Sequence, residues 1–427
     1  MKAKVALVAL AVALLFQSCA FTRAFTHWGP NITDHKIFPH DEIYPSDSVF
    51  YFKSGDEKVF KNHLVKAYKR NKTDTVDLFL SDFIKTTPTT AFIIIKNDSI
   101  LFEQYYKGYT RDSISKVFSV SKSITSLLTG IAVDEGYIES VHDPITKYIP
   151  ELKKKDPNFE TLTIEHLLNM RAGFKFKEVY ASPFSKSTTL YYGTNQLGKL
   201  KRMKFKYDPG EKFSYQSVTT AALGLAVERA IGRPLGEYLQ EKVWIPLGME
   251  NRATWDIDDK RHHSNKAHAG VNTTAIDLAK IGRLYLNNGN WNGKQIVSAD
   301  WVTASTTVVP NNRNHHYQWW RHRIAIQNPS GSRDNKHHFA FFPDSTSALL
   351  YAKEKYPDWL EHVGVFPLNE EQYILEIYHP DLYYAQGIRD QFLFICPSKK
   401  MIIVRLGERD RYVDYPYLAA QIIRAIK

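Results

Sequence analysis

A short motif at the start of an apolar run constrains this chain of 427 residues more than any other feature. Ser119-Val120-Ser121-Lys122 opens a segment rich in Ile, Leu and Ala that extends to Val133, and Gly136 follows it. This apolar spacing predicts a helix that ends at Gly136. Positions three residues apart share a helix face, so the Ser119 hydroxyl and the Lys122 amine are expected to meet. An amine placed there can take the serine proton and make the oxygen a nucleophile.

A second Ser-x-x-Lys match runs from Ser113 to Lys116 in a polar stretch. We interpret Ser113 as a solvated turn residue. Ser119 instead lies where a polar segment changes into a helix, and a helix start offers free backbone N–H groups that suit a developing oxyanion. Ser-x-x-Lys occurs by chance in long chains, so the position of the motif carries the prediction.

The N-terminal segment predicts export. Lys2 and Lys4 precede an apolar run from Val5 to Phe16, which is too short to span a bilayer comfortably and is typical of a signal peptide covering residues 1–18. Ser18 before Cys19 resembles the bacterial lipobox. That resemblance implies cleavage before Cys19, a diacylglycerol on its thiol, and a lipid-anchored protein of the bacterial cell envelope, periplasmic or on the outer membrane. The alternative is an ordinary signal peptide with an incidental cysteine.

Neither the charge nor the cysteine content points to a specific partner such as a nucleic acid. The formal net charge is +11, but the basic residues are scattered apart from Lys153–Lys155 and Lys199–Arg202, and we find no nucleic-acid motif. We interpret the charge as a solvated surface, with association with an anionic envelope as the alternative. The only other cysteine, Cys396, ends an apolar run and is expected to be a buried small hydrophobe.

Three histidine pairs lack the carboxylate or cysteine spacing of a metal site, so we predict no metal and no cofactor. They are His262-His263, His315-His316 and His337-His338.

The order of the expected helices and strands along the chain predicts an α+β fold. This fold has an antiparallel sheet flanked by helices, with an inserted all-helical lobe and a cleft between the lobes. A hairpin is expected around Asn97-Asp98, and one or two amphipathic helices are expected within residues 56–85. Further helices are expected at 163–170, 218–231, 275–286 and 417–426, and strands at 392–396 and 401–406. We place a tether at 19–55, the sheet lobe at about 86–136 and 265–427, the helical lobe at about 137–264, and a possible lid insertion at about 321–375.

Six segments resemble, in the same order, those of the serine beta-lactamase-like superfamily. They are Lys116–Ser123, Asp143–Pro150, Thr163–Gly173, Pro209–Ser217, Gly270–Ala279 and Gly387–Gly407. The resemblance covers about Ala91 to Leu406 and lies in the branch of class C beta-lactamases, family VIII esterases and 6-aminohexanoate-dimer hydrolases. It implies a serine hydrolase domain at residues 56–427 with a beta-lactamase/transpeptidase-like fold.

The same resemblance implies roles for individual residues. Ser119 would be the nucleophile, Lys122 its base, and Tyr215 the tyrosine of the second motif. A tyrosine of ordinary pKa is a poor base, but an adjacent lysine ammonium would favour its phenolate and let it move a proton. The backbone N–H groups of Ser119 and Ile388 would form the oxyanion hole.

Two departures from the superfamily pattern bear on the substrate. Ser217 stands where lactamases have asparagine, and Ala385-Gln386-Gly387 stands where they have Lys-Thr-Gly or His-x-Gly. Ala385 cannot hold the carboxylate of a beta-lactam or of a peptide end. This favours an esterase or amidase acting on a small-molecule or peptide-like substrate. The residues expected to bind that substrate are Ser217, Gln386, Gly387, Tyr192 and His268.

Two other functions stay open at this point. One is a peptidoglycan or D-amino-acid peptidase, or a beta-lactamase. The other is a non-catalytic cell-wall binding protein of the same fold, although the joint presence of Ser119, Lys122 and Tyr215 favours an enzyme.

Overall fold

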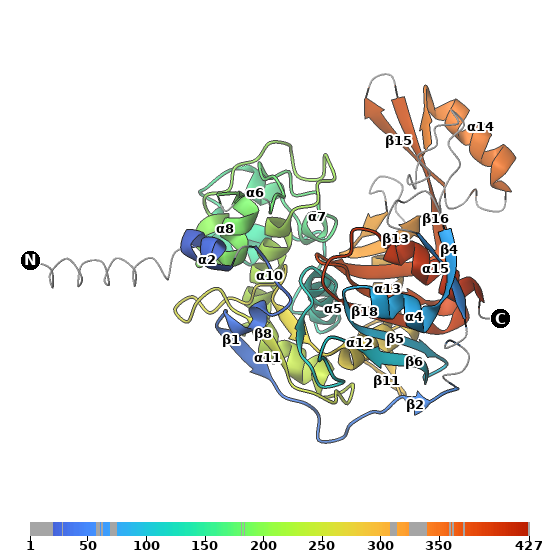
Figure 1. The fold of residues 1–427 in the computed structure, drawn as a ribbon. Coiled ribbons are helices and arrows are strands. Elements are labelled where there is room, and N and C mark those ends of the chain that lie inside the picture. Colours follow the sequence, from blue (N-terminus) through green and yellow to red (C-terminus); the bar gives the residue numbers. More distant parts are fainter. Residues whose placement is uncertain are drawn as a thin grey trace, which may run out of the picture. The chain divides into compact units, whose positions relative to one another are not determined.

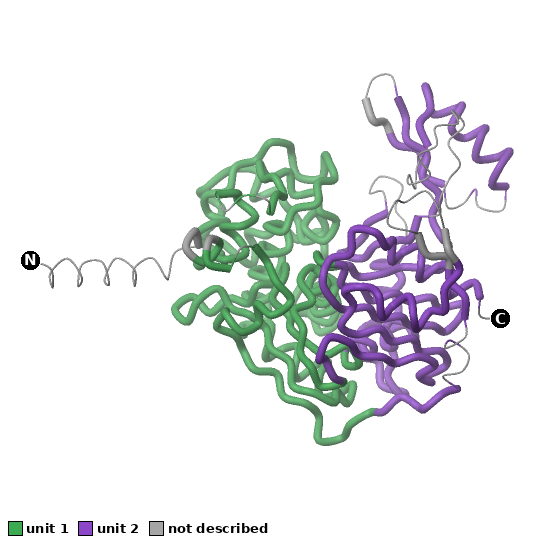
Figure 2. The backbone as a smooth tube through the Cα atoms, in the orientation of Figure 1, with its two compact units in different colours: residues 1–50, 111–277, 387–389 green, residues 51–110, 278–386, 390–427 purple. Residues whose placement is uncertain are grey.

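The computed structural model describes residues 20–27, 29–56, 60, 63–68, 75–180, 182, 184–307, 314–323, 340–357, 360, 363–369 and 372–425. The expected signal peptide, the lipidation of Cys19 and the pair His337-His338 lie outside the described residues. The chain forms two compact units (Figure 2). Unit 1 comprises residues 1–50, 111–277 and 387–389, and unit 2 comprises residues 51–110, 278–386 and 390–427.

Unit 2 is built on a large sheet with the strand order β12-β13-β16-β17-β18-β5-β6-β2 (Figure 1). Its strands are β12 (His315–His316), β13 (Trp319–Arg323), β16 (Gln372–Gly387), β17 (Gln391–Cys396), β18 (Met401–Gly407), β5 (Thr89–Lys96), β6 (Ser99–Tyr105) and β2 (Lys53–Ser54). The predicted hairpin is confirmed as β5–β6, with Asn97 and Asp98 at φ 51° and 59° as a tight two-residue turn requires. β18 then pairs antiparallel with β5, which joins N-terminal and C-terminal strands in one sheet.

Alternation along the strands gives the sheet two buried faces. Phe92 and Ile94 of β5 belong to a cluster that also contains residues of α4 (Leu80–Thr86) and α15 (Tyr415–Ala425). At Gly282 of α12 (Ala275–Leu286), a Cβ would come within 2.9 Å of Ile402 and of Leu393, so the helix approaches the sheet closely there.

An insertion extends the N-terminal half of β16. β14 (Ala340–Phe342) and β15 (Val363–Asn369) pair antiparallel with β16, and α14 (Ser345–Lys355) packs on them around a small cluster of its own (Figure 1). The described part of residues 321–375 is therefore a folded extension of the sheet. Its action as a lid stays a prediction.

Unit 1 combines helices with a four-stranded sheet of order β1-β8-β9-β7. Its main elements are α2 (Ala20–His27), β1 (His40–Ile43), β7 (Ser115–Lys116), α5 (Val120–Asp134), α7 (Ile164–Leu168), α8 (Lys186–Tyr192), α10 (Ser217–Ile231), α11 (Leu235–Leu239), β8 (Ala253–Asp256) and β9 (Val271–Thr273). The central helix α5 packs against α10 and α11. Residues 111–136 and 265–277, which we expected in the sheet lobe, therefore fall in unit 1 with the helices.

Two local expectations are wrong. Residues 29–50 are not a free tether, because β1 pairs with β8 and Ile32, Phe38 and Ile43 are buried. Leu64–Tyr68 is not helical: it is strand β3, which pairs with β4 (Thr75–Phe79). A two-stranded pair satisfies its backbone through a partner that periodicity within one segment does not reveal.

The α+β class with an antiparallel sheet is confirmed. Among the described helices, none combines the length and the hydropathy required to cross a membrane.

Candidate active site

Ser119 stands at a sharp turn between a strand and a helix. Phe118 has φ 47°, a left-handed conformation that is strained for a bulky residue, and α5 starts directly after Ser119. Ser119 is partly exposed. Within the part of the chain that the structure describes, its backbone N–H donates no hydrogen bond. The position of Ser119 thus combines an accessible hydroxyl with an available N–H at a helix start.

Lys122 follows one turn later and is buried. Its Nζ lies 2.9 Å from the Oγ of Ser119, 3.2 Å from the Oγ of Ser217 and 2.7 Å from the carbonyl oxygen of His268. Burial lowers the pKa of Lys122 to about 8, against an opposing effect from the charge of Glu178. Near neutral pH a minority of Lys122, on the order of a tenth, is therefore the neutral amine, far more than for a lysine of ordinary pKa.

Tyr215 completes the group. Its ring centroid lies 5.3 Å from the Nζ of Lys122, and its hydroxyl shares a hydrogen bond with the Ser119 side chain. Burial raises the pKa of Tyr215, the Ser119 hydrogen bond lowers it, and the charge of Glu178 raises it further. Our expectation that the lysine favours the phenolate is wrong, because desolvation of the phenolate dominates. Tyr215 is a neutral phenol in the resting site.

Glu178 is a member of the site that the sequence interpretation missed. Its carboxylate accepts the backbone N–H of Ser217 at 2.9 Å and the Ser217 hydroxyl at 2.6 Å. The hydroxyl of Tyr180 donates to the same carboxylate and lies 3.1 Å from the Oγ of Ser217. One detectable signal was present: Glu178 is the only acidic residue between Gly173 and Tyr207.

These contacts determine which group donates and which accepts in each hydrogen bond. Because the Ser217 hydroxyl donates to Glu178, its oxygen lone pairs remain to accept an N–H from Lys122. The carbonyl of His268 accepts a second N–H. In the neutral amine the remaining position on Nζ is the lone pair, and it faces the Ser119 hydroxyl. The network therefore orients the Lys122 lone pair toward the Ser119 hydroxyl.

The loop that carries Glu178 is held by two local features. Gly173 has φ +75°, and a Cβ there would lie 2.2 Å from the carbonyl oxygen of Tyr207, so only glycine fits this crossing. The side-chain amide of Gln216 donates to the carbonyls of Phe174 and Phe176 at 3.0 and 2.8 Å. Since Gln216 directly precedes Ser217, the loop and Ser217 are positioned together.

Three of the five residues predicted to bind substrate are buried. Ser217, Tyr192 and His268 are almost fully buried, at 1, 0 and 1 % exposure, so none of them presents a side chain to a substrate in this structure. Ser217 and His268 instead hold Lys122. Gln386 belongs to unit 2, where it lines a cavity of about 350 Å³, whereas Gly387 and Ile388 are assigned to unit 1. The roles of Gln386, Gly387 and Ile388 stay predictions.

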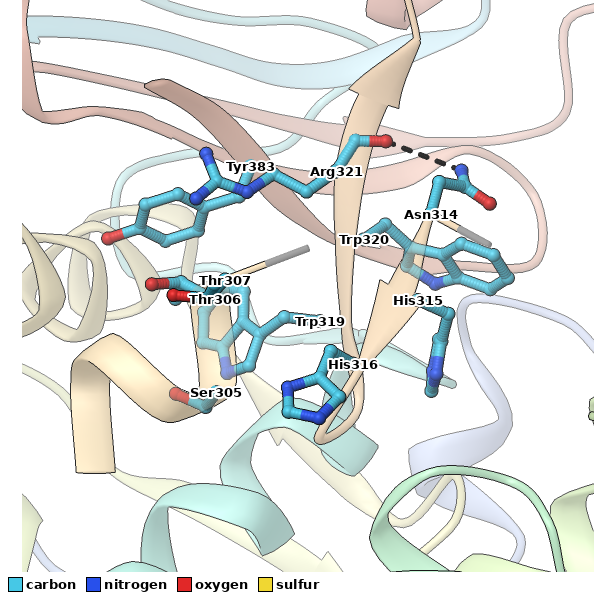
Figure 3. A pocket seen from close by; sticks show the side chains of 10 residues that line it. All are labelled: Ser305, Thr306, Thr307, Asn314, His315, His316, Trp319, Trp320, Arg321 and Tyr383. Atoms are coloured by element: carbon cyan, nitrogen blue, oxygen red, sulfur yellow. Dashed lines mark hydrogen bonds between the residues drawn. The ribbon is translucent and has the colours of Figure 1, made fainter. Parts of the chain in front are cut away.

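The two described histidine pairs lie in different surroundings. His315 and His316 line a hollow in unit 2 that leaves no room for a water molecule, beside Trp319 and Tyr383 (Figure 3). His262 groups with Asp258 and Asp259, with ligand atoms within 4.8 Å of one another. These carboxylates already accept backbone N–H groups of their own loop, which accounts for the grouping.

Comparison with known proteins places this geometry in context. A family model described as Beta-lactamase matches residues 76–426. The 6-aminohexanoate-dimer hydrolase of Paenarthrobacter ureafaciens is 30% identical over 236 residues, which cover 53% of this chain and 59% of that protein. The D-alanyl-D-alanine-carboxypeptidase/endopeptidase AmpH of Escherichia coli K12 is 24% identical over 230 residues, covering 49% of this chain and 57% of that protein. The matches thus span less than two thirds of the length of these curated relatives.

Solved structures share the fold. A structure from Bacillus anthracis, named as a candidate 6-aminohexanoate-dimer hydrolase, superposes with a TM-score of 0.69 at 21% identity and covers 92% of both chains. A class C beta-lactamase superposes with a TM-score of 0.51 at 15% identity, covering 81% of this chain and 94% of that one. At these identities the likeness is one of fold.

Proposed function

Because this chain belongs to the beta-lactamase family, we propose that it is a serine hydrolase that cleaves an ester or amide bond through an acyl-enzyme on Ser119. The observation that carries the proposal is the 2.9 Å contact between the Oγ of Ser119 and the Nζ of Lys122. The lowered pKa of Lys122 makes this amine a competent base near neutral pH.

The reaction follows from the directions of the hydrogen bonds. Neutral Lys122 takes the proton of Ser119 as Oγ attacks the substrate carbonyl and forms the tetrahedral oxyanion. The backbone N–H of Ser119, with that of Ile388, stabilises this oxyanion. Tyr215, a neutral phenol hydrogen-bonded to Ser119, donates a proton to the leaving alcohol or amine. Water then attacks the acyl-enzyme carbonyl and gives a proton to the Tyr215 phenolate. The bond between the acyl carbon and Oγ breaks, and the Lys122 ammonium returns its proton to Ser119.

The proposed substrate class rests on the absence of a cationic side chain at position 385. Lactamase and carboxypeptidase substrates carry a carboxylate that a Lys or His side chain of the third motif holds, and this chain has Ala385 there. The similarity to a 6-aminohexanoate-dimer hydrolase favours a linear ester or amide. The similarity to AmpH supports a D-amino-acid peptidase as the second candidate.

A fluorophosphonate probe tests the nucleophile. The intact protein is expected to be labelled, Ser119→Ala to lose the label, and Ser113→Ala to keep it. An unlabelled intact protein would instead support a non-catalytic cell-wall binding protein. A panel of p-nitrophenyl esters, linear amides, nitrocefin and D-Ala-D-Ala peptides then separates the enzyme classes. Nitrocefin or peptide turnover as fast as that of the linear substrates would contradict the argument from Ala385.

We also propose that the protein is anchored in the bacterial envelope through a lipid on Cys19. The support is the order of Lys2, Lys4, the apolar run to Phe16 and then Ser18-Cys19. Incorporation of labelled palmitate in a bacterial host should occur in the natural chain and be lost in Cys19→Ser. Equal incorporation in both chains would contradict the anchor.

A further inference from the structure

One surface of unit 1, outside the candidate active site, is strongly basic. Residues 175–206 contain eight Lys and Arg residues but a single acidic one, Glu178. Glu178 points to Ser217 and Tyr180, so it is engaged away from the basic side chains. Six of the eight basic residues are exposed, and we call them the basic face: Lys175, Lys177, Lys186, Arg202, Lys204 and Lys206.

The backbone brings two Lys-Phe-Lys segments together. Phe174 and Phe205 form an antiparallel bridge with ring centroids 5.0 Å apart. The N–H of Lys175 donates to the carbonyl of Lys204 at 2.7 Å. The alternation of a strand then leaves Phe174 buried and Phe205 half-buried, whereas Lys175 and Lys204 are exposed. Lys175 and Lys204 therefore stand opposite each other.

A third segment adds to this cluster. The Nζ of Lys186, at the start of α8, donates to the carbonyl oxygen of Lys175 at 2.9 Å. Among the described residues, no carboxylate forms an ion pair with any member of the basic face. Like charges opposite one another destabilise a strand pair. An external anion would relieve this repulsion.

The position of the N-terminal helix favours a membrane surface as the source of that anion. α2 begins at Ala20 and packs against α8: Arg23 donates to the carbonyl of Tyr192 at 3.3 Å, and the His27 and Tyr192 rings stack (Figure 1). Lys186 lies about 9 Å along α8 from Tyr192 at the helical rise. Residue 19 lies only four residues before Arg23, at most about 14 Å of extended chain. A lipid on Cys19 would therefore hold the bilayer surface near the basic face.

We propose that the basic face binds the phosphate headgroups of an anionic phospholipid bilayer and holds unit 1 against the membrane. Of the arguments for this proposal, only the one from proximity rests on the proposed Cys19 anchor. The proposal does not depend on the hydrolytic activity. Phe184 supports the proposal: it is 69% exposed, two residues before Lys186, and an exposed aromatic ring beside lysines suits the boundary between headgroups and acyl chains.

Lysine labelling tests the proposal on the full chain. The protein is reconstituted with phosphatidylcholine vesicles or with vesicles that also contain phosphatidylglycerol, and an amine-reactive reagent is followed at each lysine by mass spectrometry. We expect the five lysines of the basic face to react about fivefold more slowly with phosphatidylglycerol present, matching roughly 1 kcal/mol per surface-bound lysine. Lys294 and Lys353, exposed in unit 2, serve as internal controls whose rates should not change. High salt should abolish the protection.

A charge variant makes the test specific. Lys175→Gln with Lys204→Gln should release the protection of Lys177, Lys186 and Lys206, whereas Lys294→Gln with Lys353→Gln should leave it intact. Equal labelling of the basic face in both vesicle types would overturn the proposal. Protection by soluble dextran sulfate but not by phosphatidylglycerol would also overturn it, in favour of a polyanionic polymer. Retention on pure phosphatidylcholine depends on Cys19 alone, so a failed anchor is distinguishable from a failed basic face.

Discussion

The carboxylate of Glu178 accepts both the backbone N–H and the hydroxyl of Ser217, at 2.9 and 2.6 Å. This double contact leaves Ser217 as an acceptor toward Lys122 rather than a donor. Where lactamases have an asparagine, this chain has Ser217, and Glu178 accepts a hydrogen bond from its hydroxyl. The arrangement links the charge of a loop residue to the protonation state of the proposed base.

The pH dependence of hydrolysis should report Lys122. Only the neutral amine can accept the Ser119 proton, and the pKa of Lys122 is lowered to about 8. We therefore expect kcat/KM for a p-nitrophenyl ester to rise with pH and level off above about 8, because the ammonium form predominates below that value. A pH–rate profile that is flat through this region would show that another group is the base.

Glu178→Gln should displace that profile. The negative charge of Glu178 raises the pKa of Lys122, so its removal should shift the rising limb to lower pH. The plateau should fall about tenfold, because the amide no longer binds the Ser217 proton as strongly as a carboxylate does. The matched control is Glu211→Gln, an exposed glutamate whose carboxylate caps Asp208. An unshifted profile in Glu178→Gln would show that the charge of Glu178 does not act on Lys122.

Ser217→Ala separates a positioning role from substrate binding. Ser217 is 1% exposed and contacts Lys122, so its loss should lower kcat about tenfold through misorientation of the amine and leave KM nearly unchanged. Ser214→Ala serves as the control. A raised KM with unchanged kcat would restore the substrate-binding role that the sequence predicted.

Tyr215→Phe should distinguish amides from activated esters. An amine leaving group requires a proton, and general-acid catalysis contributes about 10²- to 10⁴-fold. We expect a loss of that size for a linear amide and a much smaller one for a p-nitrophenyl ester, whose phenolate leaves unprotonated. Tyr207→Phe, nearby in sequence, is the control in steady-state assays of both substrates. Equal losses on both would contradict proton donation by Tyr215.

Gly173→Ala should destabilise unit 1. A Cβ would lie 2.2 Å from a backbone oxygen at a left-handed φ, so we expect a decrease of about 3 kcal/mol in the free energy of unfolding. Gly293 also has a positive φ, but a Cβ there meets nothing within 4 Å, and Gly293→Ala should cost only about 1 kcal/mol. Urea denaturation of both variants measures the difference, and equal values would show that the loop relaxes.

The local patterns predicted much of this protein. The apolar spacing after Ser119 predicted α5, the turn at Asn97-Asp98 predicted the β5–β6 hairpin, and the runs at 392–396 and 401–406 predicted β17 and β18. Helical spacing also predicted that the Ser119 and Lys122 side chains meet. Each of these depends on residues close together in the sequence, so periodicity and turn chemistry suffice.

Other features depended on partners far along the chain. β1 was invisible because it is ordered by β8, more than two hundred residues away. The burial of Tyr192 and His268, and the dominance of desolvation over the lysine charge at Tyr215, required the packed interior. So did the pairing of Glu178 with Ser217 and the opposition of Lys175 and Lys204. The sequence alone determined that Ser119 and Lys122 meet at the start of one helix, because both lie within one turn. Only the tertiary structure decided what surrounds that amine, because its other partners come from segments 95 and 146 residues away.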